Sequence, residues 1–154
     1  MNWFFALISN KFFIVALSSW ATAQVLKTII HAAIYKKLEL ERLFGDGGMP
    51  SGHSATVTSV AAMSALVFGL GSFEFAIAAI LAIIVCHDAM GVRRETGKQA
   101  TIIIEMMELL EAMTKKDLPE AKLKEFVGHT PLQVGAGIII GIANACLMYF
   151  VVFA

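Results

Sequence analysis

Four long apolar runs dominate the sequence, and each is close to the length needed to cross a bilayer. They are residues 12–35, about 54–70, 73–90 and 131–153. A helix needs about 20 apolar residues to span the hydrocarbon core, with roughly 17 to 25 observed. The pattern therefore predicts an all-α integral membrane bundle of about four transmembrane helices, forming one domain over residues 1–154.

Two other stretches carry helical patterns of a different kind. Residues 2–9 contain Trp3, Phe4 and Phe5, which suits a short interfacial helix in the headgroup layer. After the third run, one helical face carries Ile102, Met106, Leu109, Leu110 and Met113, and the opposite face carries Glu105, Glu108, Glu111 and Lys115. This pattern is typical of an amphipathic helix. We expect it in the cytoplasm, at the membrane surface or packed on the bundle, with a second short helix at 120–127.

Composition and charge support a membrane location and predict an orientation. Hydrophobic residues make up 58% of the chain, and the mean hydropathy is +0.75, above the range of soluble globular proteins. Lys and Arg are concentrated in residues 36–42 and 93–124, whereas the predicted tight turn GLGSFE at 69–74 has none. The positive-inside rule then places both basic segments in the cytoplasm. We expect an integral protein of the plasma (inner) membrane with both termini outside, and Cys86 and Cys146 reduced.

Three polar clusters interrupt the apolar runs on the same predicted membrane face. They are GGMPSGHSA at 47–55, HDAMGVRRETGKQA at 87–100 and GHTPLQVGAG at 128–137. Hydrolysis of a phosphomonoester requires cations and N–H donors around the transferring group, together with groups that move protons. Each cluster alone has a simpler interpretation, as a turn, a pair of membrane anchors or a helix cap. Their convergence on one face favours a phosphate site.

Particular residues in these clusters suit particular tasks. Arg93 and Arg94 carry forked donors that match phosphate oxygens. Pro50 precedes a predicted helix whose first N–H groups, at 51–53, would point at the same anion. One histidine would attack phosphorus, and the other would protonate the leaving oxygen.

The first span adds a polar stripe. Residues at intervals of four, three and four lie along one side of its helix: Trp20, Gln24, Lys27 and His31. A charged residue within a span normally faces the protein interior or an aqueous cavity. Lys27 therefore points into a polar pocket, or alternatively snorkels to the interface. Asp88, near the end of the third span, is a partner for such a cation or for a histidine.

Together these residues resemble the type 2 phosphatidic acid phosphatase superfamily, which also contains the vanadium-dependent haloperoxidases. PSGHSA is similar to the second signature of that superfamily, and GHTPLQVGAGIIIG is similar to the third. With GVRRETGKQA, the set most resembles the divergent branch of small membrane proteins. The resemblance extends from Gln24 to Gly141.

The resemblance implies a phosphatase that uses neither a metal nor another cofactor. His129 would be the nucleophile that forms a phosphohistidine, and His53 the general acid and later the base. The phosphate oxygens would be bound by Ser51, the backbone of Gly52 and His53, Lys27, and Arg93 or Arg94. Gln133 stands where the superfamily usually has an Asp that orients the nucleophile, and Asp88 is a candidate to replace that carboxylate.

The expected substrate is a lipid phosphomonoester, such as phosphatidylglycerophosphate or phosphatidic acid, because the site lies at headgroup depth. The alternative is a membrane protein that binds or moves an anionic lipid without turnover, and Gln133 is the feature that favours it. Gly137 and Gly141 form a small-residue face that fits either a homodimer or close packing within the bundle. No nucleic-acid partner is expected.

Overall fold

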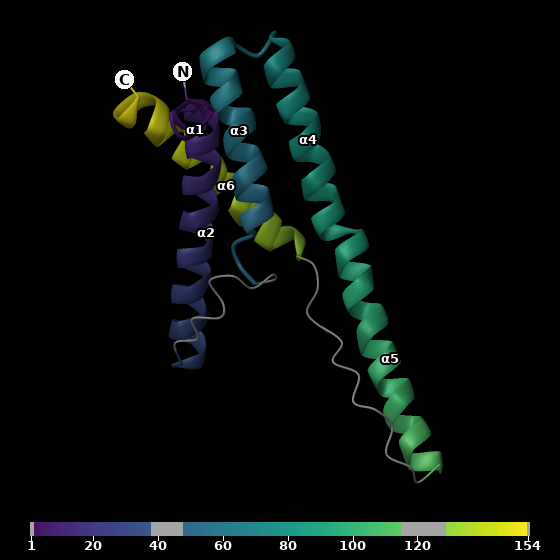
Figure 1. Cartoon of the computed structure of the whole chain (residues 1–154). Helices are drawn as coiled ribbons and strands as arrows, with labels where there is room; N and C mark the ends of the chain where they lie inside the picture. The colour runs from purple at the N-terminus through teal and green to yellow at the C-terminus, as the bar shows by residue number, and fades with distance from the viewer. Residues whose placement is uncertain (1, 38–47, 115–128, 154) are drawn as a thin grey trace.

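The computed structural model describes residues 2–37, 48–114 and 129–153, and side chains at 92–94 lie outside its description. Every regular element of the described chain is a helix (Figure 1), which confirms the all-α prediction. The elements are α1 (Trp3–Ile8), α2 (Lys11–Tyr35), α3 (Gly52–Phe68), α4 (Phe73–Met90), α5 (Val92–Thr114), α6 (Pro131–Leu147) and the π-helical turn η2 (Met148–Val152). The short helix predicted at 120–127 lies outside the described residues.

Among the described residues, three helical segments are long and apolar enough to cross a membrane. They are Lys11–Tyr35, Phe73–Thr114 and Pro131–Val152. The remaining predicted span, at about 54–70, corresponds to α3. This helix has 17 residues and is at the lower end of the spanning range. The structure therefore agrees with a bundle of about four spans, three of them long and one short. α3 is the central helix, because α2, α4 and α6 all pack against it.

The helices in the bundle begin at side-chain caps. Asn10 accepts hydrogen bonds from the N–H groups of Phe12 and Phe13 at the start of α2. Ser72 accepts from the Phe75 N–H at the start of α4, after a turn in which Gly69 has φ 84°. The tight turn predicted at 69–74, between α3 and α4, is thereby confirmed. In Figure 1 this turn and both termini lie at one end of the bundle, and α3 and α6 begin toward the other.

Two glycines allow α6 to approach α3 closely. A Cβ on Gly137 would lie 2.5 Å from the backbone oxygen of Ser51, and one on Gly141 would lie 2.5 Å from that of Ala55. No other residue fits at such distances. The small-residue face is therefore used for packing within the bundle, which was one of its two open interpretations. Homodimer formation stays a prediction, and the small-residue face no longer supports it.

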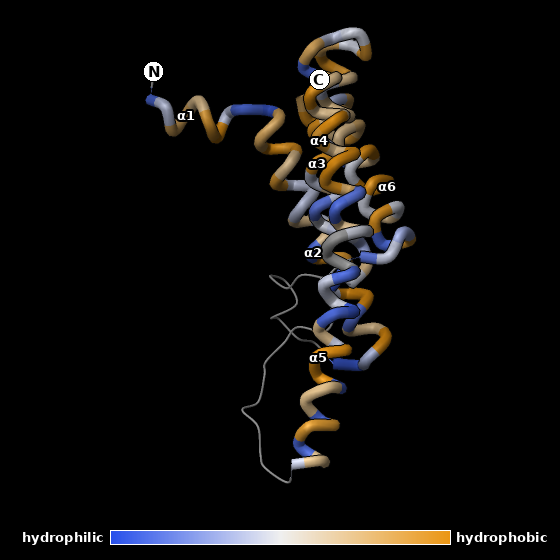
Figure 2. Tube along the Cα trace, turned by 90° about the vertical axis from the view of Figure 1, so that its right-hand side faces the viewer, coloured by the Kyte–Doolittle hydropathy of each residue, from blue (hydrophilic) through white to orange (hydrophobic). Residues whose placement is uncertain are grey.

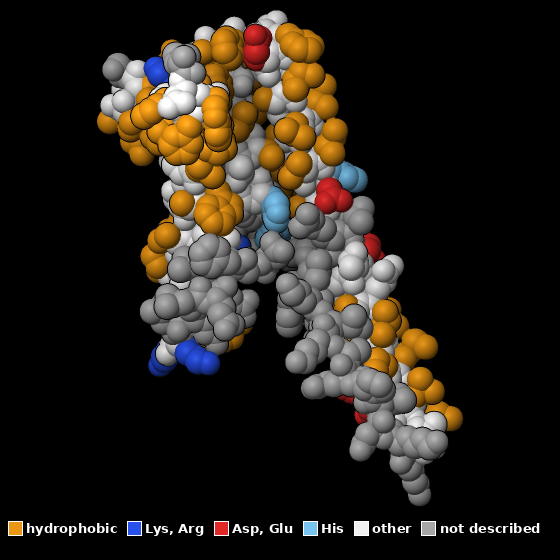
Figure 3. Space-filling model, viewed as in Figure 1, with side chains coloured by type: hydrophobic (Ala, Val, Ile, Leu, Met, Phe, Trp, Pro, Cys, Tyr) orange, Lys and Arg blue, Asp and Glu red, His pale blue; other side chains and the backbone are white. Residues whose placement is uncertain are grey.

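The bundle interior consists mainly of small and polar side chains, with Met63, Val15 and Val134 as its larger members, and most large apolar side chains point outward. Fully buried positions include Ser19, Ala23, Ser54, Ala55 and Ser59. Figure 3 shows orange apolar side chains covering the outer faces of the helices. Close packing of small residues is typical of helix contacts in lipid. On α6, the Asn144 amide donates to the hydroxyls of Ser18 and Ser19 on α2, at 2.8 and 2.7 Å.

The first and fifth helices extend away from the bundle. α1 projects sideways (Figure 2), and its residues are exposed, as expected for an interfacial helix. α5 continues beyond α4 in nearly the same direction (Figure 1). Helical hydrogen bonding passes through Gly91, whose N–H donates to the His87 oxygen and whose oxygen accepts from the Glu95 N–H. Of the two positions expected for this amphipathic helix, packing along the bundle is wrong.

Candidate functional site

A cavity of about 390 Å³ lies where α3 and α6 begin. Its lining comes from α2, α3, α4 and the residue two positions before α6, and consists of Trp20, Gln24, Lys27, Gly52, His53, Thr56, Val57, Val85 and His129. Four of the site residues expected from the sequence are therefore brought together: Lys27, Gly52, His53 and His129.

The two histidines face each other closely enough to act on one ligand. Their ring centroids are 6.1 Å apart, and the ring planes meet at 61°. His53 belongs to the first turn of α3. His129 is only 3% exposed, and its backbone N–H donates to the Ala89 oxygen at the end of α4. A group between the two rings would be within reach of both imidazoles.

The hydrogen bonds of Gln133 determine which nitrogen of His129 carries the proton. The Thr130 N–H donates to Gln133 Oε1 at 3.0 Å, so that atom is the amide oxygen. His129 Nδ1 lies 3.2 Å from the same oxygen. Because an amide oxygen can only accept, Nδ1 must be the donor. In the neutral ring the lone pair is then on Nε2, the arrangement that a nucleophilic histidine requires.

Lys27 is buried at this end of α2. It is 6% exposed and lines the cavity, and a Cβ on Gly48 would lie 3.4 Å from its Cγ. Of the two interpretations of Lys27, the structure thus agrees with the pocket and not with snorkelling. His31 continues the same stripe but stacks on Tyr35, with ring centroids 4.5 Å apart, and does not line the cavity.

Ser51 has a structural position rather than a place in the cavity wall. Its hydroxyl caps α3 by accepting from the N–H and the hydroxyl of Ser54, at 3.3 and 3.0 Å. Its own N–H donates to the Gln133 oxygen at 3.0 Å. The side chain is fully buried and does not line the cavity. The helix start uses this hydroxyl as an acceptor, and its expected contact with phosphate stays a prediction.

The remaining expected site residues lie on α4 and α5. Asp88 is half-buried in the last turn of α4 and does not line the cavity. Arg93 and Arg94 belong to the first turn of α5, and their side chains lie outside the described part of the structure. Their roles stay predictions. Cys86 and Cys146 are free thiols, as expected.

Several features of the site were missed from the sequence. Thr56, Val57 and Val85 were not assigned, although Thr56 and Val57 follow His53 by three and four residues and so share its helix face. Thr130 and Gln133 form a complete capping box at the start of α6. The string Thr-x-x-Gln is a known signature of that motif and could have revealed it. Within the described residues, no group of three or more His, Cys, Asp or Glu side chains could hold a metal ion.

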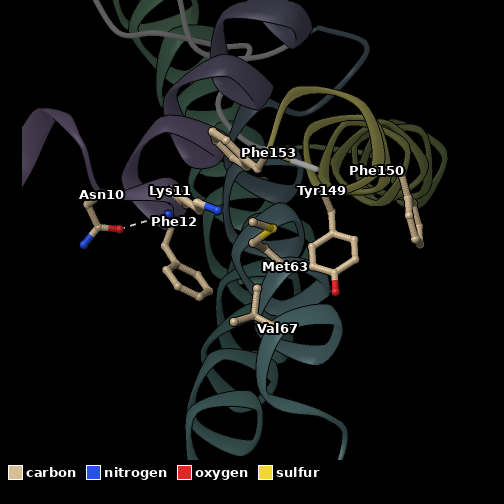
Figure 4. A pocket seen from close by; sticks show the side chains of 8 residues that line it. All are labelled: Asn10, Lys11, Phe12, Met63, Val67, Tyr149, Phe150 and Phe153. Carbon is tan, nitrogen blue, oxygen red and sulfur yellow. Dashed lines mark hydrogen bonds between the residues drawn. The ribbon is translucent and has the colours of Figure 1, made fainter.

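A second cavity, of about 630 Å³, lies at the opposite end of the bundle (Figure 4). It is lined by Asn10, Lys11, Phe12, Met63, Val67, Tyr149, Phe150 and Phe153. The Lys11 ammonium lies 5.1 Å from the centroid of the Phe153 ring, a cation–π distance. This largely aromatic lining lacks the paired imidazoles that distinguish the first cavity.

Comparisons with known proteins find related sequences. The sequence profile described as the divergent PAP2 family matches residues 8–144, a range that includes every residue lining the histidine cavity. A protein of Bacillus subtilis (strain 168) described as the uncharacterized membrane protein YuiD is 39% identical over 154 residues, covering 94% of this chain and 98% of the relative. No solved structure matches. The chain therefore belongs to the divergent PAP2 family of membrane proteins.

Proposed function

We propose that this protein is a membrane-embedded phosphatase that hydrolyses a lipid phosphomonoester through a phosphohistidine. The observation that carries the proposal is the pair of imidazoles 6.1 Å apart beside a cavity that buried Lys27 also lines. Membership of a PAP2-related family supports it. The four helices around the cavity carry apolar outer faces, so a substrate with acyl chains would reach the site from the bilayer.

The first half-reaction transfers the phosphoryl group to the protein. The lone pair on His129 Nε2 attacks phosphorus, and the N–P bond forms while the P–O bond to the alcohol breaks. Protonated His53 gives its proton to the departing oxygen. Lys27 and the backbone N–H groups of Gly52 and His53, which have no intrahelical acceptor, meet the negative charge on the phosphoryl oxygens.

The second half-reaction releases phosphate. His53 removes a proton from water, and the water oxygen attacks phosphorus. The N–P bond breaks, its electron pair returns to Nε2 and inorganic phosphate leaves. Throughout both steps Gln133 Oε1, 3.2 Å from His129 Nδ1, accepts the hydrogen bond from that nitrogen and fixes the ring orientation. The positive-inside rule puts this chemistry on the cytoplasmic leaflet, where phosphatidylglycerophosphate and phosphatidic acid are candidate substrates.

Phosphate release by detergent-solubilised protein tests the proposal. We expect His129→Ala to lower kcat by at least about a thousandfold and to remove the acid-labile phosphohistidine, because the nucleophile is gone. His53→Ala should slow the hydrolysis of lipid phosphates strongly but that of nitrophenyl phosphate much less, since the nitrophenolate leaving group needs little protonation. The control is His87→Ala, which changes an exposed histidine in the last turn of α4 and should keep full activity.

One result would favour the other candidate function. Gln133 supplies an amide where a carboxylate would stabilise imidazolium, which suits a protein that binds anionic lipids without turnover. In that case the wild type would bind lipid phosphates but release no phosphate from any of them, and no label would appear on His129.

A further inference from the structure

Gln24 lines the histidine cavity and holds a buried, unsatisfied acceptor. The residue is only 6% exposed. Its Oε1 is buried, and none of the described residues donates a hydrogen bond to it. Buried polar side-chain atoms nearly always have a partner, and a buried acceptor without one is costly. An acceptor that lacks a protein donor, on a side chain that lines a ligand cavity, is suited to a donor on the ligand.

A neighbouring donor limits the kinds of ligand group that fit beside Gln24. Trp20 Nε1 and Gln24 Oε1 each lie 3.9 Å from the point where a Cβ on Gly52 would be. The indole N–H can only donate, and the amide oxygen can only accept. Gly52, which lines the cavity, is therefore flanked by one donor and one acceptor. A hydroxyl, which accepts and donates at the same time, complements both.

The position of Gly52 relates such a hydroxyl to the alcohol part of the substrate. Gly52 immediately precedes His53, the proposed acid that protonates the leaving oxygen. His129, which would receive the phosphoryl group, comes from the other side of the cavity, before α6. A hydroxyl beside Gly52 thus lies next to the leaving alcohol.

We propose that Gln24 Oε1 accepts a hydrogen bond from a free hydroxyl on the leaving alcohol, so that the site selects polyol phosphomonoesters. This inference rests on the proposed function and specifies its substrate class. A phosphorylated glycerol head group carries such a hydroxyl beside the ester carbon. The alcohol released from phosphatidic acid carries none, because both of its other oxygens are acylated.

Two lipids that differ by one hydroxyl provide the test. Phosphatidylglycerophosphate is compared with a synthetic analogue that has the same acyl chains and lacks the free head-group hydroxyl, both in mixed micelles. We expect the wild type to show a kcat/KM at least about tenfold higher for the hydroxylated lipid, the value of one hydrogen bond to a buried acceptor. Gln24→Leu, of similar size but without an acceptor, should bring that ratio close to one.

Further variants separate this role from a structural one. Gln24→Glu keeps an acceptor and should keep the preference, although its charge lowers both rates. Gly52→Ala should weaken the preference from the other side, because its methyl group fills the space at ordinary contact distances of 3.5 Å from Trp20 and 3.9 Å from Gln24. Gln99→Leu, the same change at an exposed position on α5, should leave the ratio unaltered. Equal rates for the two lipids in the wild type would overturn the inference, as would a Gln24→Leu protein that loses activity on both in proportion.

A binding measurement keeps the inference separate from the proposed chemistry. Non-hydrolysable phosphonates of the same two lipids can be titrated while the fluorescence of Trp20 is followed in a Trp3→Phe background. The hydroxylated phosphonate should bind at least about tenfold more tightly to the protein with Gln24, and equally to Gln24→Leu. A protein that shows this difference but releases no phosphate would refute the phosphatase and retain the hydroxyl selectivity. Equal affinities in the protein with Gln24 would refute the selectivity itself.

Discussion

Gln133 performs two tasks with one oxygen atom. Oε1 accepts from the Thr130 N–H, completing the capping box of α6, and from His129 Nδ1. The helix start and the orientation of the proposed nucleophile are therefore set by the same side chain. A carboxylate at this position would accept both bonds and add a charge that stabilises imidazolium.

Substitutions at Gln133 should separate these two tasks. Gln133→Glu keeps the side-chain length and both acceptors, so we expect phosphate release to be retained or raised. Gln133→Leu removes the acceptor that fixes the Nδ1 proton, and kcat/KM should fall at least about tenfold. Thr130→Ala is the matched control, because it also breaks the capping box, at about 1 kcal/mol of stability, while the acceptor for His129 remains. Equal activity losses in Gln133→Leu and Thr130→Ala would show that the cap alone matters.

Single residues of the site differed in how well the sequence predicted them. His53 and His129 were identified because they belong to polar clusters that interrupt the apolar runs, and Lys27 because a cation is rare inside such a run. Ser51 was assigned to phosphate and not as a helix cap, because a serine before a helix has two uses that look alike in sequence. It can contact an anion or cap the N–H groups itself, and only the three-dimensional contacts distinguish them.

At the scale of helices, the approach of α6 to α3 depends on glycines that a small change should disrupt. Gly137→Ala would place a methyl group 2.5 Å from the Ser51 backbone oxygen, so α6 must move. We expect a stability loss of about 1 to 3 kcal/mol and lower activity, since the same contact positions Gln133. Thermal unfolding in detergent and phosphate release measure the two effects.

The same helix provides the control for this prediction. Gly135→Ala adds an identical methyl group where nothing lies within 4 Å. Removing a glycine from a helix interior should leave stability unchanged or raise it by about 0.5 to 1 kcal/mol. If Gly135→Ala were as harmful as Gly137→Ala, the harm would come from general loss of glycine rather than from the α3 contact.

Helix positions followed closely from the sequence, but the direction of α5 did not. The bilayer requires long apolar runs, so α4 matches its predicted span and α2 and α6 match theirs within a few residues. An amphipathic pattern describes the face of a helix and not its axis. The backbone bonds of Gly91 to His87 and Glu95 carry α4 into α5 with little change of direction.

At the scale of the whole molecule, the membrane orientation is testable by cysteine labelling. In a background without Cys86 and Cys146, cysteines replace Lys37 and Gly71, which are exposed at opposite ends of the bundle. The positive-inside rule predicts that a membrane-impermeant thiol reagent added to intact cells labels position 71 and not position 37. Lysed cells, in which both positions should react, are the control. Labelling only at position 37 in intact cells would show the opposite orientation, with the site at the outer leaflet.

The cavity as a whole was only partly predictable. Its polar residues were visible as clusters on one predicted face, since an even number of crossings returns the chain to the same side. Val85 and Val57 carry no chemical signal, and which apolar residues close a cavity depends on helix rotation and packing. Those quantities are set by contacts between spans and not by the pattern within any one of them.

The lining of the histidine cavity has a consequence for how the protein is made. Its residues come from α2, α3, α4 and, last, from His129 just before α6. A nascent chain that has inserted its first three spans already holds Lys27, Gln24 and His53, but it lacks the proposed nucleophile. On the proposed mechanism, activity would begin only once the last part of the chain is in place, and truncated products of translation would be inert toward the lipids around them.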